Sequence, residues 1–219
     1  MSGALAAAMA NAGEPVCAYK PVLTGLDETP GESEPGAWPP DHELLAAAAR
    51  MHPEEVAPLR FGPAVSPHLA ARLAGETIDP ARLIAGARAP GERGRTLVVE
   101  GVGGLLTPLS EDYSVCDLAR DIGLPVLIAA RPGLGTINHT LLTLQAARAA
   151  GLDVRAVVLT PWPRRLSELE RSNRETIGRI GGVAVEGLAA LAAPDPAALA
   201  RAGAELPWRE WLAMPYGGG

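Results

Sequence analysis

The fold is decided by the stretch Leu97-Val98-Val99-Glu100-Gly101-Val102-Gly103-Gly104-Leu105. A short apolar run is typical of a strand that is buried on both faces, as in a parallel sheet covered by helices. Here the run ends in a carboxylate and then in glycines, which let the backbone approach a ligand and offer free N–H groups to phosphate oxygens. Open α/β sheets bind their ligands at the carboxyl ends of the strands. The stretch therefore predicts a Mg-nucleotide site, although the G-x-x-x-x-G-K-[ST] loop that such a site normally needs is nowhere in the sequence.

The composition fits one soluble domain that spans residues 1–219. The formal net charge of −6 argues against nucleic acid or an anionic membrane surface as the partner. Cys17 and Cys116 have no C-x-x-C spacing, so neither a disulfide framework nor a zinc site is indicated. Because no signal segment and no membrane-spanning apolar run is visible, a cytoplasmic location is expected. The end of the chain, 213–219, is expected to be a disordered tail.

Strands alternate with helices along the chain, which indicates an α/β fold with a doubly wound, mostly parallel sheet. The expected strands are 15–19, 97–100, 125–130 and 154–159. The expected helices are 2–11, 41–50, 69–74, 115–122, 139–150 and 167–180. Residues 27–40 are rich in Pro, Gly and Glu and are expected to form an exposed loop.

Three charged residues are candidates for the chemistry of the site. Lys20 follows one predicted strand and Glu100 ends another, so both are expected at the same edge of the sheet. There the Lys20 ammonium could stabilise negative charge on a carbamate or a transferring phosphoryl group, or it could simply be a solvated lysine that ends a strand. Glu100 could bind Mg²⁺, because an unpaired charge at the end of a buried strand is costly. Asp41 could supply a second carboxylate, but on local evidence alone an ordinary helix N-cap is the favoured explanation.

A second glycine-containing loop, Gly133–Asn138, also leads from a strand into a helix. Helix N-termini attract carboxylates and phosphates, but an ordinary loop is the alternative. His68 and His139 lack metal-ligand spacing to any cluster and are expected to be structural.

Several of these segments together resemble the dethiobiotin synthetase family. The resemblance rests on Ala18-Tyr19-Lys20-Pro21-Val22-Leu23-Thr24-Gly25, Ser66-Pro67-His68, Val98-Val99-Glu100-Gly101-Val102-Gly103-Gly104, Thr107-Pro108-Leu109 and Gly133-Leu134-Gly135-Thr136-Ile137-Asn138-His139-Thr140-Leu141-Leu142-Thr143. The segments occur in the family's order and cover most of the chain. The resemblance implies a P-loop NTPase-like fold and a ligase of biotin biosynthesis. In that reaction 7,8-diaminononanoate and CO₂ form a carbamate, ATP phosphorylates it, and the second amine closes the ureido ring.

The resemblance also implies roles for individual residues. Lys20 matches the family's catalytic lysine, and Thr24 matches a substrate-contacting hydroxyl. Asp41 and Glu100 match the magnesium-binding acids and also contact the nucleotide, as do Gly101, Val102 and Gly103. Gly135 and Asn138 would lie near the substrate carboxylate across a homodimer interface. The implied cofactor is Mg²⁺, with ATP as a substrate, and the implied partners are small molecules and a second copy of the chain.

The chain departs from the family pattern at two places. The family begins with a strand and a G-T-D-T-G-V-G-K-T-like phosphate loop, whereas Met1 lies inside what matches the following helix. Without that central strand, unpaired edges are expected on its neighbours. After the strand 154–159 the family usually offers Asn and Asp to the adenine, but here the chain reads Thr160-Pro161-Trp162-Pro163. The sequence therefore does not predict which residues would recognise the adenine.

The favoured hypothesis is a dethiobiotin synthetase whose recorded start lies too late, which predicts an in-frame strand and phosphate loop upstream in the gene. The first alternative is a short ligand-binding or degenerate member of the same fold that does not hydrolyse ATP. The second is another ATP-using amide-forming or reductive enzyme of the same fold superclass. The run Tyr19-Lys20-Pro21-Val22 argues for the biotin-pathway family.

Overall fold

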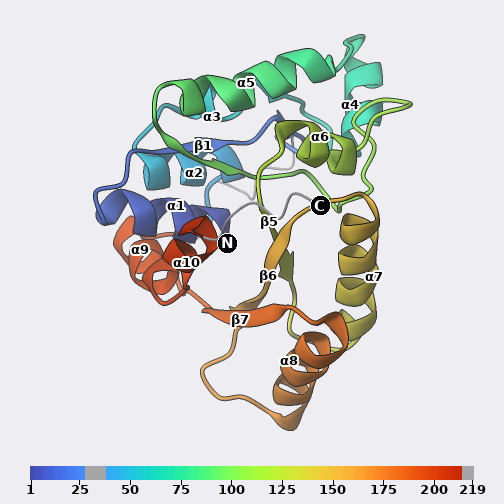
Figure 1. Cartoon of the computed structure of the whole chain (residues 1–219). Coiled ribbons are helices and arrows are strands. Elements are labelled where there is room, and N and C mark those ends of the chain that lie inside the picture. Colours follow the sequence, from blue (N-terminus) through green and yellow to red (C-terminus); the bar gives the residue numbers. More distant parts are fainter. Residues whose placement is uncertain (28–37, 214–219) are drawn as a thin grey trace.

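A computed structural model describes residues 1–27 and 38–213 of the chain (Figure 1). In chain order the elements are α1 (Ser2–Asn11), β1 (Val16–Tyr19), β2 (Val22–Leu23), α2 (Asp41–Ala49), α3 (Pro53–Val56), β3 (Leu59–Arg60), α4 (Pro67–Ala74), α5 (Pro80–Glu92), β4 (Thr96–Val99), α6 (Val115–Ile122), β5 (Val126–Ala130), α7 (Thr136–Ala149), β6 (Val154–Trp162), α8 (Glu168–Gly181), β7 (Ala184–Ala189), α9 (Pro196–Ala204) and α10 (Trp208–Ala213).

All pairings between these strands are parallel, which confirms the predicted α/β class. β1 pairs with β4, β2 pairs with β3, and β6 lies between β5 and β7. Within the described residues, β4 has β1 as its only strand partner, and β5 has only β6. The strands thus fall into separate sets rather than one continuous sheet (Figure 1). This agrees with the expectation of unpaired edges.

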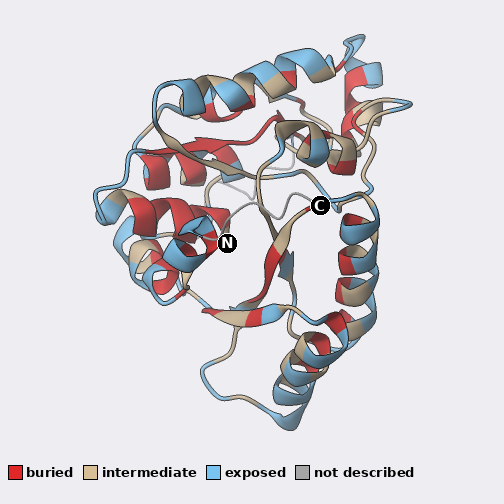
Figure 2. Cartoon of the chain, viewed as in Figure 1, coloured by how far each residue is buried: buried red, intermediate tan, exposed pale blue. Residues whose placement is uncertain are grey.

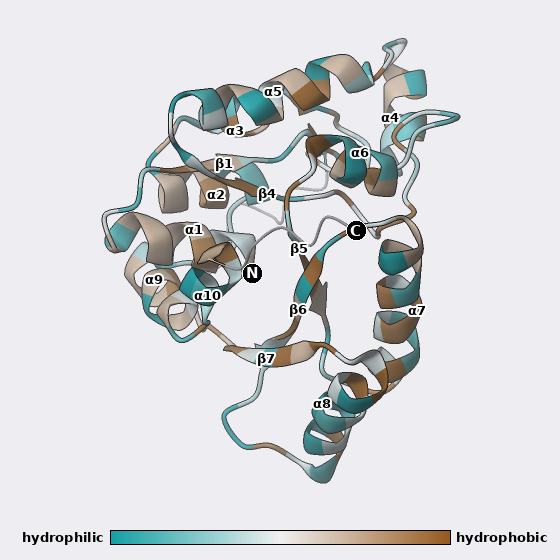
Figure 3. Cartoon of the chain, in the orientation of Figure 1, coloured by the Kyte–Doolittle hydropathy of each residue, from teal (hydrophilic) through white to brown (hydrophobic). Residues whose placement is uncertain are grey.

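The strand that decides the fold is less buried than the sequence predicts. All four residues of β4 are only half-buried, whereas all four residues of its neighbour β1 are buried (Figure 2). β5 is likewise mostly half-buried, while the core of β6 is buried. Both β1 and β4 have a single strand partner, so the number of partners does not explain the difference, and the apolar side chains of β4 (Figure 3) did not reveal it. The prediction of burial on both faces was therefore wrong for β4 and β5.

Helices cover the strand sets and position the start of α1. α5 packs against β1 and β4, while α7 contacts β5 and β6 and α8 contacts β7. α1 packs between α2 and α9 (Figure 1), and nearly all of its residues are buried. Its sequence SGALAAAMAN is rich in alanine, so neighbouring helices can approach it closely from more than one side. One cluster of buried hydrophobic residues is built around this helix.

The predicted elements agree with the structure to within a few residues. α1 and α6 have the predicted bounds, and α7 begins three residues before its predicted start at His139. The sequence analysis did not predict β2, α3, β3, α5, β7, α9 or α10. Most of the predicted loop 27–40, residues 28–37, lies outside the described residues, as does 214–219 of the predicted tail. In the part that is described, every helix is too short or too polar to span a bilayer.

Candidate active site

The ends of β1 and β4 bring Lys20 and Glu100 together. The two strands run in parallel with Tyr19 opposite Val99, so the next residue of each strand emerges at the same edge. The backbone N–H of Glu100 donates to the carbonyl of Tyr19 (2.8 Å), and the N–H of Lys20 donates to the carbonyl of Val56 (2.8 Å). The Lys20 ammonium lies 2.7 Å from Glu100 Oε1. The predicted meeting of these two residues is confirmed.

Asp41 completes the cluster from α2. Its Oδ2 lies 3.0 Å from Lys20 Nζ. The N-cap of α2 is Pro40 and Asp41 is the first helical residue, so the interpretation of Asp41 as an ordinary N-cap was wrong. Lys20 is only 4 % exposed, which also contradicts a solvated lysine at a strand end. The three residues form a buried cation between two carboxylates, which we call the Lys20 cluster.

The two carboxylates keep Lys20 charged despite its burial. Burial is the largest single influence and lowers the pKa of the Lys20 ammonium. The charge of Glu100 and its hydrogen bond, followed by those of Asp41, act in the opposite direction and together leave the pKa above its usual value. Lys20 is therefore a cation at neutral pH and cannot serve there as a general base. What it offers is a fixed positive charge with little access to water.

Tyr19 anchors the end of β1 on the opposite side from the cluster. Its hydroxyl donates to the carbonyl of Leu83 in α5 (3.2 Å). A Cβ at Gly86 would lie 2.8 Å from Tyr19 Cζ, so this position in α5 needs a glycine to admit the ring. Burial raises the pKa of Tyr19 to about 12.

The raised pKa of Tyr19 makes its contribution to stability depend on pH. An unfolded tyrosine ionises near pH 10, so stability from this group is fully present below pH ~10 and is lost as the pH rises towards 12. At pH 8 we expect Tyr19→Phe to unfold with roughly 1 kcal/mol less free energy than the parent, because it lacks the hydrogen bond to Leu83. Between pH 10 and 12 the free energy of unfolding of the parent should fall by roughly 2 to 3 kcal/mol, a loss that the variant does not show because it has no phenol to ionise. Urea unfolding at several pH values measures this gap, and a gap that stays constant with pH would contradict the assignment.

The glycine run after Glu100 forms a tight turn next to the cluster. The N–H of Gly104 donates to the hydroxyl of Thr107 (2.8 Å), and a Cβ at Gly103, which has a φ of +68°, would lie 3.3 Å from Thr107 Cγ2. Gly101 and Val102 lie in the same turn, directly after Glu100. The predicted nucleotide-contacting run thus begins at the cluster.

Thr24 lies directly after β2 and is half-buried. The following residue, Gly25, has a φ of +88° and donates its N–H to the carbonyl of Pro63 (3.1 Å), which fixes the turn. The role of Thr24 towards the substrate stays a prediction.

The second glycine loop is built differently from its prediction. Gly135 is the N-cap of α7 with a φ of +88°, so Asn138 lies in the first turn of the helix rather than in a loop before it. The amide of Asn173 in α8 donates to the carbonyls of Pro132 (2.9 Å) and Gly133 (3.2 Å) and holds the loop from behind. Gly135 and Asn138 are exposed, and the contacts described for the Lys20 cluster do not include them. Their substrate role stays a prediction.

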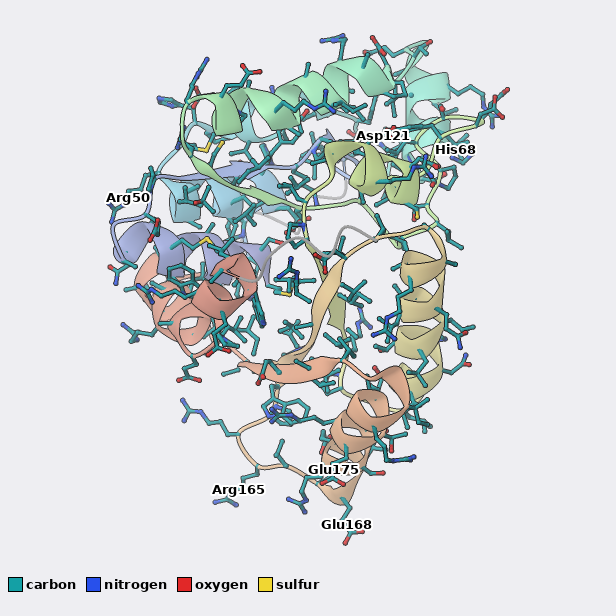
Figure 4. All side chains as sticks on the ribbon, viewed as in Figure 1. Arg50, His68, Asp121, Arg165, Glu168 and Glu175 are labelled. Atoms are coloured by element: carbon teal, nitrogen blue, oxygen red, sulfur yellow. The ribbon has the colours of Figure 1, made fainter. Side chains whose placement is uncertain are left out.

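The two histidines differ from each other. His68 is half-buried, and its Nδ1 is buried without a hydrogen-bond partner in the described part of the chain. It lies in the first turn of α4, at the same end of the molecule as Asp121 (Figure 4). His139 is exposed, and its expected structural role stays a prediction.

The cluster has the donor set that suits magnesium. Asp41 and Glu100 supply hard oxygen ligands, and a magnesium ion needs few protein ligands because it keeps several waters and takes others from phosphate. In residues 1–27 and 38–213, no group of three or more His, Cys, Asp or Glu side chains could hold a metal by itself. A site with two carboxylates that is completed by a phosphate is consistent with both observations.

A cavity that is lined in part by the start of α1 was not predicted from the sequence. It lies between α1, α2 and the carboxyl ends of β6 and β7, and Trp38 and Thr160 are among the residues that line it. The carboxyl ends of parallel strands are where such sites occur, but β7 was not predicted and Trp38 fell within the expected exposed loop.

Comparison with known proteins agrees with the geometry. A family model described as an AAA domain matches residues 1–193. The chain is 44% identical over 158 residues to the ATP-dependent dethiobiotin synthetase of Anaeromyxobacter dehalogenans (strain 2CP-1), covering 71% of this chain and 67% of the relative. It is 42% identical over 191 residues to the enzyme of that name from Anaeromyxobacter sp. (strain Fw109-5), with 82% of each chain covered. It is 32% identical over 190 residues to that of Bacillus subtilis (strain 168), with 86% and 79% covered. With its parallel strands and buried Lys20 cluster, this chain belongs to the family of ATP-dependent dethiobiotin synthetases.

Proposed function

We propose that the protein is an ATP-dependent dethiobiotin synthetase, a ligase of biotin biosynthesis that closes the ureido ring from 7,8-diaminononanoate, CO₂ and ATP. Membership of the family supports the proposal. The observation that carries it is the buried Lys20 ammonium between Glu100 and Asp41 at the carboxyl ends of β1 and β4. No observation favours a non-catalytic ligand-binding protein over this enzyme.

The reaction needs a fixed cation beside the carbon atom that comes from CO₂. One substrate amine adds to CO₂ and loses a proton to give a carbamate, and ATP transfers its γ-phosphoryl group to a carbamate oxygen and leaves as ADP. The second amine then attacks the carbonyl carbon: the new C–N bond forms, this amine loses a proton to solvent, and the C–O bond to phosphate breaks as the ring closes. Negative charge develops on the carbamate oxygens when CO₂ is captured and on the oxygen of the tetrahedral intermediate when the ring closes, and a buried ammonium stabilises such charge.

Asp41 and Glu100 are proposed to hold Mg²⁺ between the Lys20 cluster and the nucleotide phosphates. When bound, the ion neutralises charge on the phosphate oxygens. The run from Glu100 to Gly103 contacts the nucleotide, since its turn begins at the metal-binding carboxylate. Lys20 in turn holds both carboxylates in place through its two short contacts.

The remaining substrate contacts are proposed to come from two places. Thr24 contacts the diamine end of the substrate, and Gly135 and Asn138 of a second copy bind its carboxylate, in a cytoplasmic homodimer. The side chain of Leu134 is 93% exposed and that of Leu142, on α7, is 56% exposed. Exposed apolar side chains beside this loop favour a protein partner over open solvent.

The activity is tested by phosphate release from ATP that depends on both diaminononanoate and CO₂, with formation of dethiobiotin detected by mass spectrometry. Turnover that requires both substrates supports the proposal. Phosphate release that is indifferent to the diamine would contradict it.

Glu100→Ala should weaken the use of magnesium more than the fold. We expect the Mg²⁺ concentration for half-maximal activity to rise at least about tenfold, because even partners of metal ligands contribute that much to metal affinity. Glu168→Gln is the matched control, since this exposed carboxylate lies at the α8 end of the molecule (Figure 4). A magnesium titration of ATP turnover measures the shift. An unchanged midpoint in Glu100→Ala would remove Glu100 from the metal site.

A further inference from the structure

Thr107 closes the turn that follows Glu100 through two hydrogen bonds with Gly104. The backbone N–H of Gly104 donates to the Thr107 hydroxyl (2.8 Å), and the backbone N–H of Thr107 donates to the carbonyl of Gly104 (3.0 Å). Any residue could make the second bond, but the first needs a side chain that can accept a hydrogen bond. The hydroxyl of Thr107 therefore adds a restraint that the backbone alone does not supply.

Gly103 packs directly against the same side chain. Its φ of +68° favours glycine, and a Cβ at this position would lie 2.6 Å from the Oγ1 atom of Thr107. The backbone of Gly103 and the hydroxyl of Thr107 are thus in contact with no room for a larger residue between them. The position of Thr107 therefore limits the conformation of the last residue in the run Glu100–Gly103.

The backbone of Thr107 is anchored on the other side to the start of α6. The carbonyl of Thr107 accepts a hydrogen bond from the N–H of Val115 (3.0 Å), the first residue of that helix. The next residue, Pro108, forms an antiparallel bridge with Ser114. Ser114 is the N-cap of α6 and forms a capping box with Asp117. Thr107 therefore connects the turn to a helix end that is itself well fixed.

The glycines of the turn have few restraints of their own. Gly101, Gly103 and Gly104 are all exposed, and nothing lies within 4 Å of a Cβ built at Gly104. Glycine loses more conformational freedom than any other residue when it is ordered. In the part of the chain that the structure describes, the bond from Gly104 to Thr107 is the only hydrogen bond between residues 101–104 and a side chain. The order of the turn therefore depends strongly on this one hydroxyl.

We propose that Thr107 is a positioning residue of the nucleotide site, whose hydroxyl holds the run Glu100–Gly103 in the conformation that contacts the nucleotide. This inference rests on the proposed function, because that function places the nucleotide at this run. It assigns to the site a residue that acts through the glycine turn and not by touching the nucleotide itself.

Removal of the hydroxyl should affect nucleotide binding more than folding. Because Gly104 is exposed, water can replace the hydroxyl at its N–H, so the folded state loses little. The turn is then free to adopt other conformations and must be ordered when the nucleotide binds, which lowers the affinity. The diamine is proposed to contact Thr24, which lies after β2 and outside this turn. Its binding should not carry the same ordering cost.

The test compares the parent chain with Thr107→Val and Thr107→Ser by calorimetric titration with magnesium ATP and by steady-state kinetics. Valine has nearly the shape of threonine but lacks the hydroxyl, whereas serine keeps it. We expect Thr107→Val to bind magnesium ATP about fivefold more weakly and to raise the KM for ATP by a similar factor. Its kcat and its KM for diaminononanoate should stay within about twofold of the parent values. Thr107→Ser should bind magnesium ATP within about twofold of the parent.

Ser167→Ala is the matched control for the loss of a local hydrogen bond. The Ser167 hydroxyl accepts the N–H of Leu169 (3.2 Å) at the start of α8, so it also restrains a short backbone segment. The contacts described for the Lys20 cluster do not include it. Thermal unfolding should show that Thr107→Val is no less stable than Ser167→Ala, while only Thr107→Val binds magnesium ATP more weakly.

Four results would overturn the inference. They are no binding of magnesium ATP by the parent, an unchanged affinity in Thr107→Val, an equal loss in Thr107→Ser, or an equal worsening of kcat and of both KM values, which would indicate a general structural defect. Turnover of the parent with diaminononanoate and CO₂ tests the proposed function separately. Weaker binding in Thr107→Val without any turnover in the parent would defeat the proposed function and leave the role of Thr107 standing. Turnover in the parent with unchanged affinity in Thr107→Val would defeat that role and leave the function standing.

Discussion

Lys20→Ala should lower the turnover number by about 10²- to 10³-fold while the chain stays folded, because removal of one preorganised donor to a developing negative charge has an effect of this size. The expected loss arises in the chemical steps, so the KM for ATP should change much less than kcat. The variant also leaves Glu100 and Asp41 next to each other without their shared cation. Because the Asp41 side chain is 60% exposed, water can solvate it and the fold should survive.

Lys20→Met is the matched control for shape, since it keeps the length of the side chain and removes only the charge. We expect it to be as inactive as Lys20→Ala. Retained activity in Lys20→Met would show that the lysine fills space rather than acting on charge. Thermal unfolding of both variants separates a loss of catalysis from a loss of structure.

The charge state of this residue can be observed directly. Lys20 is the only lysine of the chain, so ¹⁵N-lysine labelling gives a single side-chain signal. Its titration midpoint should lie above the usual value near 10.4, since the two carboxylates raise the pKa. A midpoint near neutrality would remove the argument that Lys20 acts as a cation.

The sequence predicted the elements that carry strong local signals. α6 was found with its bounds intact because Ser114 and Asp117 form a capping box and Gly123 ends the helix. α5 and α9 also begin with an Asp-Pro signal, at Asp79 and Asp195, but were missed. Their interiors contain glycine, which lowers helix propensity.

Other elements depend on contacts that no local pattern records. β7 contains Gly187, where a Cβ would lie 2.6 Å from the indole of Trp162 on β6. Glycine normally weakens a strand, so its presence in β7 makes sense only with the neighbouring tryptophan in place. β2 and β3 have two residues each and are too short to show a period.

The site was predictable where it depends on strand ends and not where it depends on distant contacts. Lys20 and Glu100 could be placed together because both follow strands of a parallel sheet. Asp41 could not, since on local evidence it resembles a helix cap, and only the family resemblance pointed to the site. The cavity that Trp38 and Thr160 line requires the end of β7 and the position of Trp38, and neither is visible in the sequence.

Gly203→Ala should be the most destabilising of the substitutions considered, with a loss of about 3 kcal/mol or more in the free energy of unfolding. A Cβ at this position in α9 would lie 2.6 Å from the carbonyl carbon of Ala4 in α1 and closer still to its oxygen. It would also lie 3.0 Å from Ala8 Cβ. The obstacle is the backbone of a buried helix, which cannot rotate away as a side chain can, so α1 and α9 must separate.

Chemical denaturation of Gly203→Ala and of a matched variant, Gly91→Ala, tests this origin of the effect. Gly91 also lies in a helix, α5, but nothing lies within 4 Å of a Cβ built there. Alanine has the higher helix propensity, so Gly91→Ala should be neutral or more stable by up to about 1 kcal/mol. Equal effects at the two positions would show that backbone entropy, rather than the close contact, determines the change in the free energy of unfolding. Since the start of α1 lines the cavity between α1, α2 and the ends of β6 and β7, a separation of α1 from α9 should also change the shape of that cavity, whereas Gly91→Ala should leave it as in the parent.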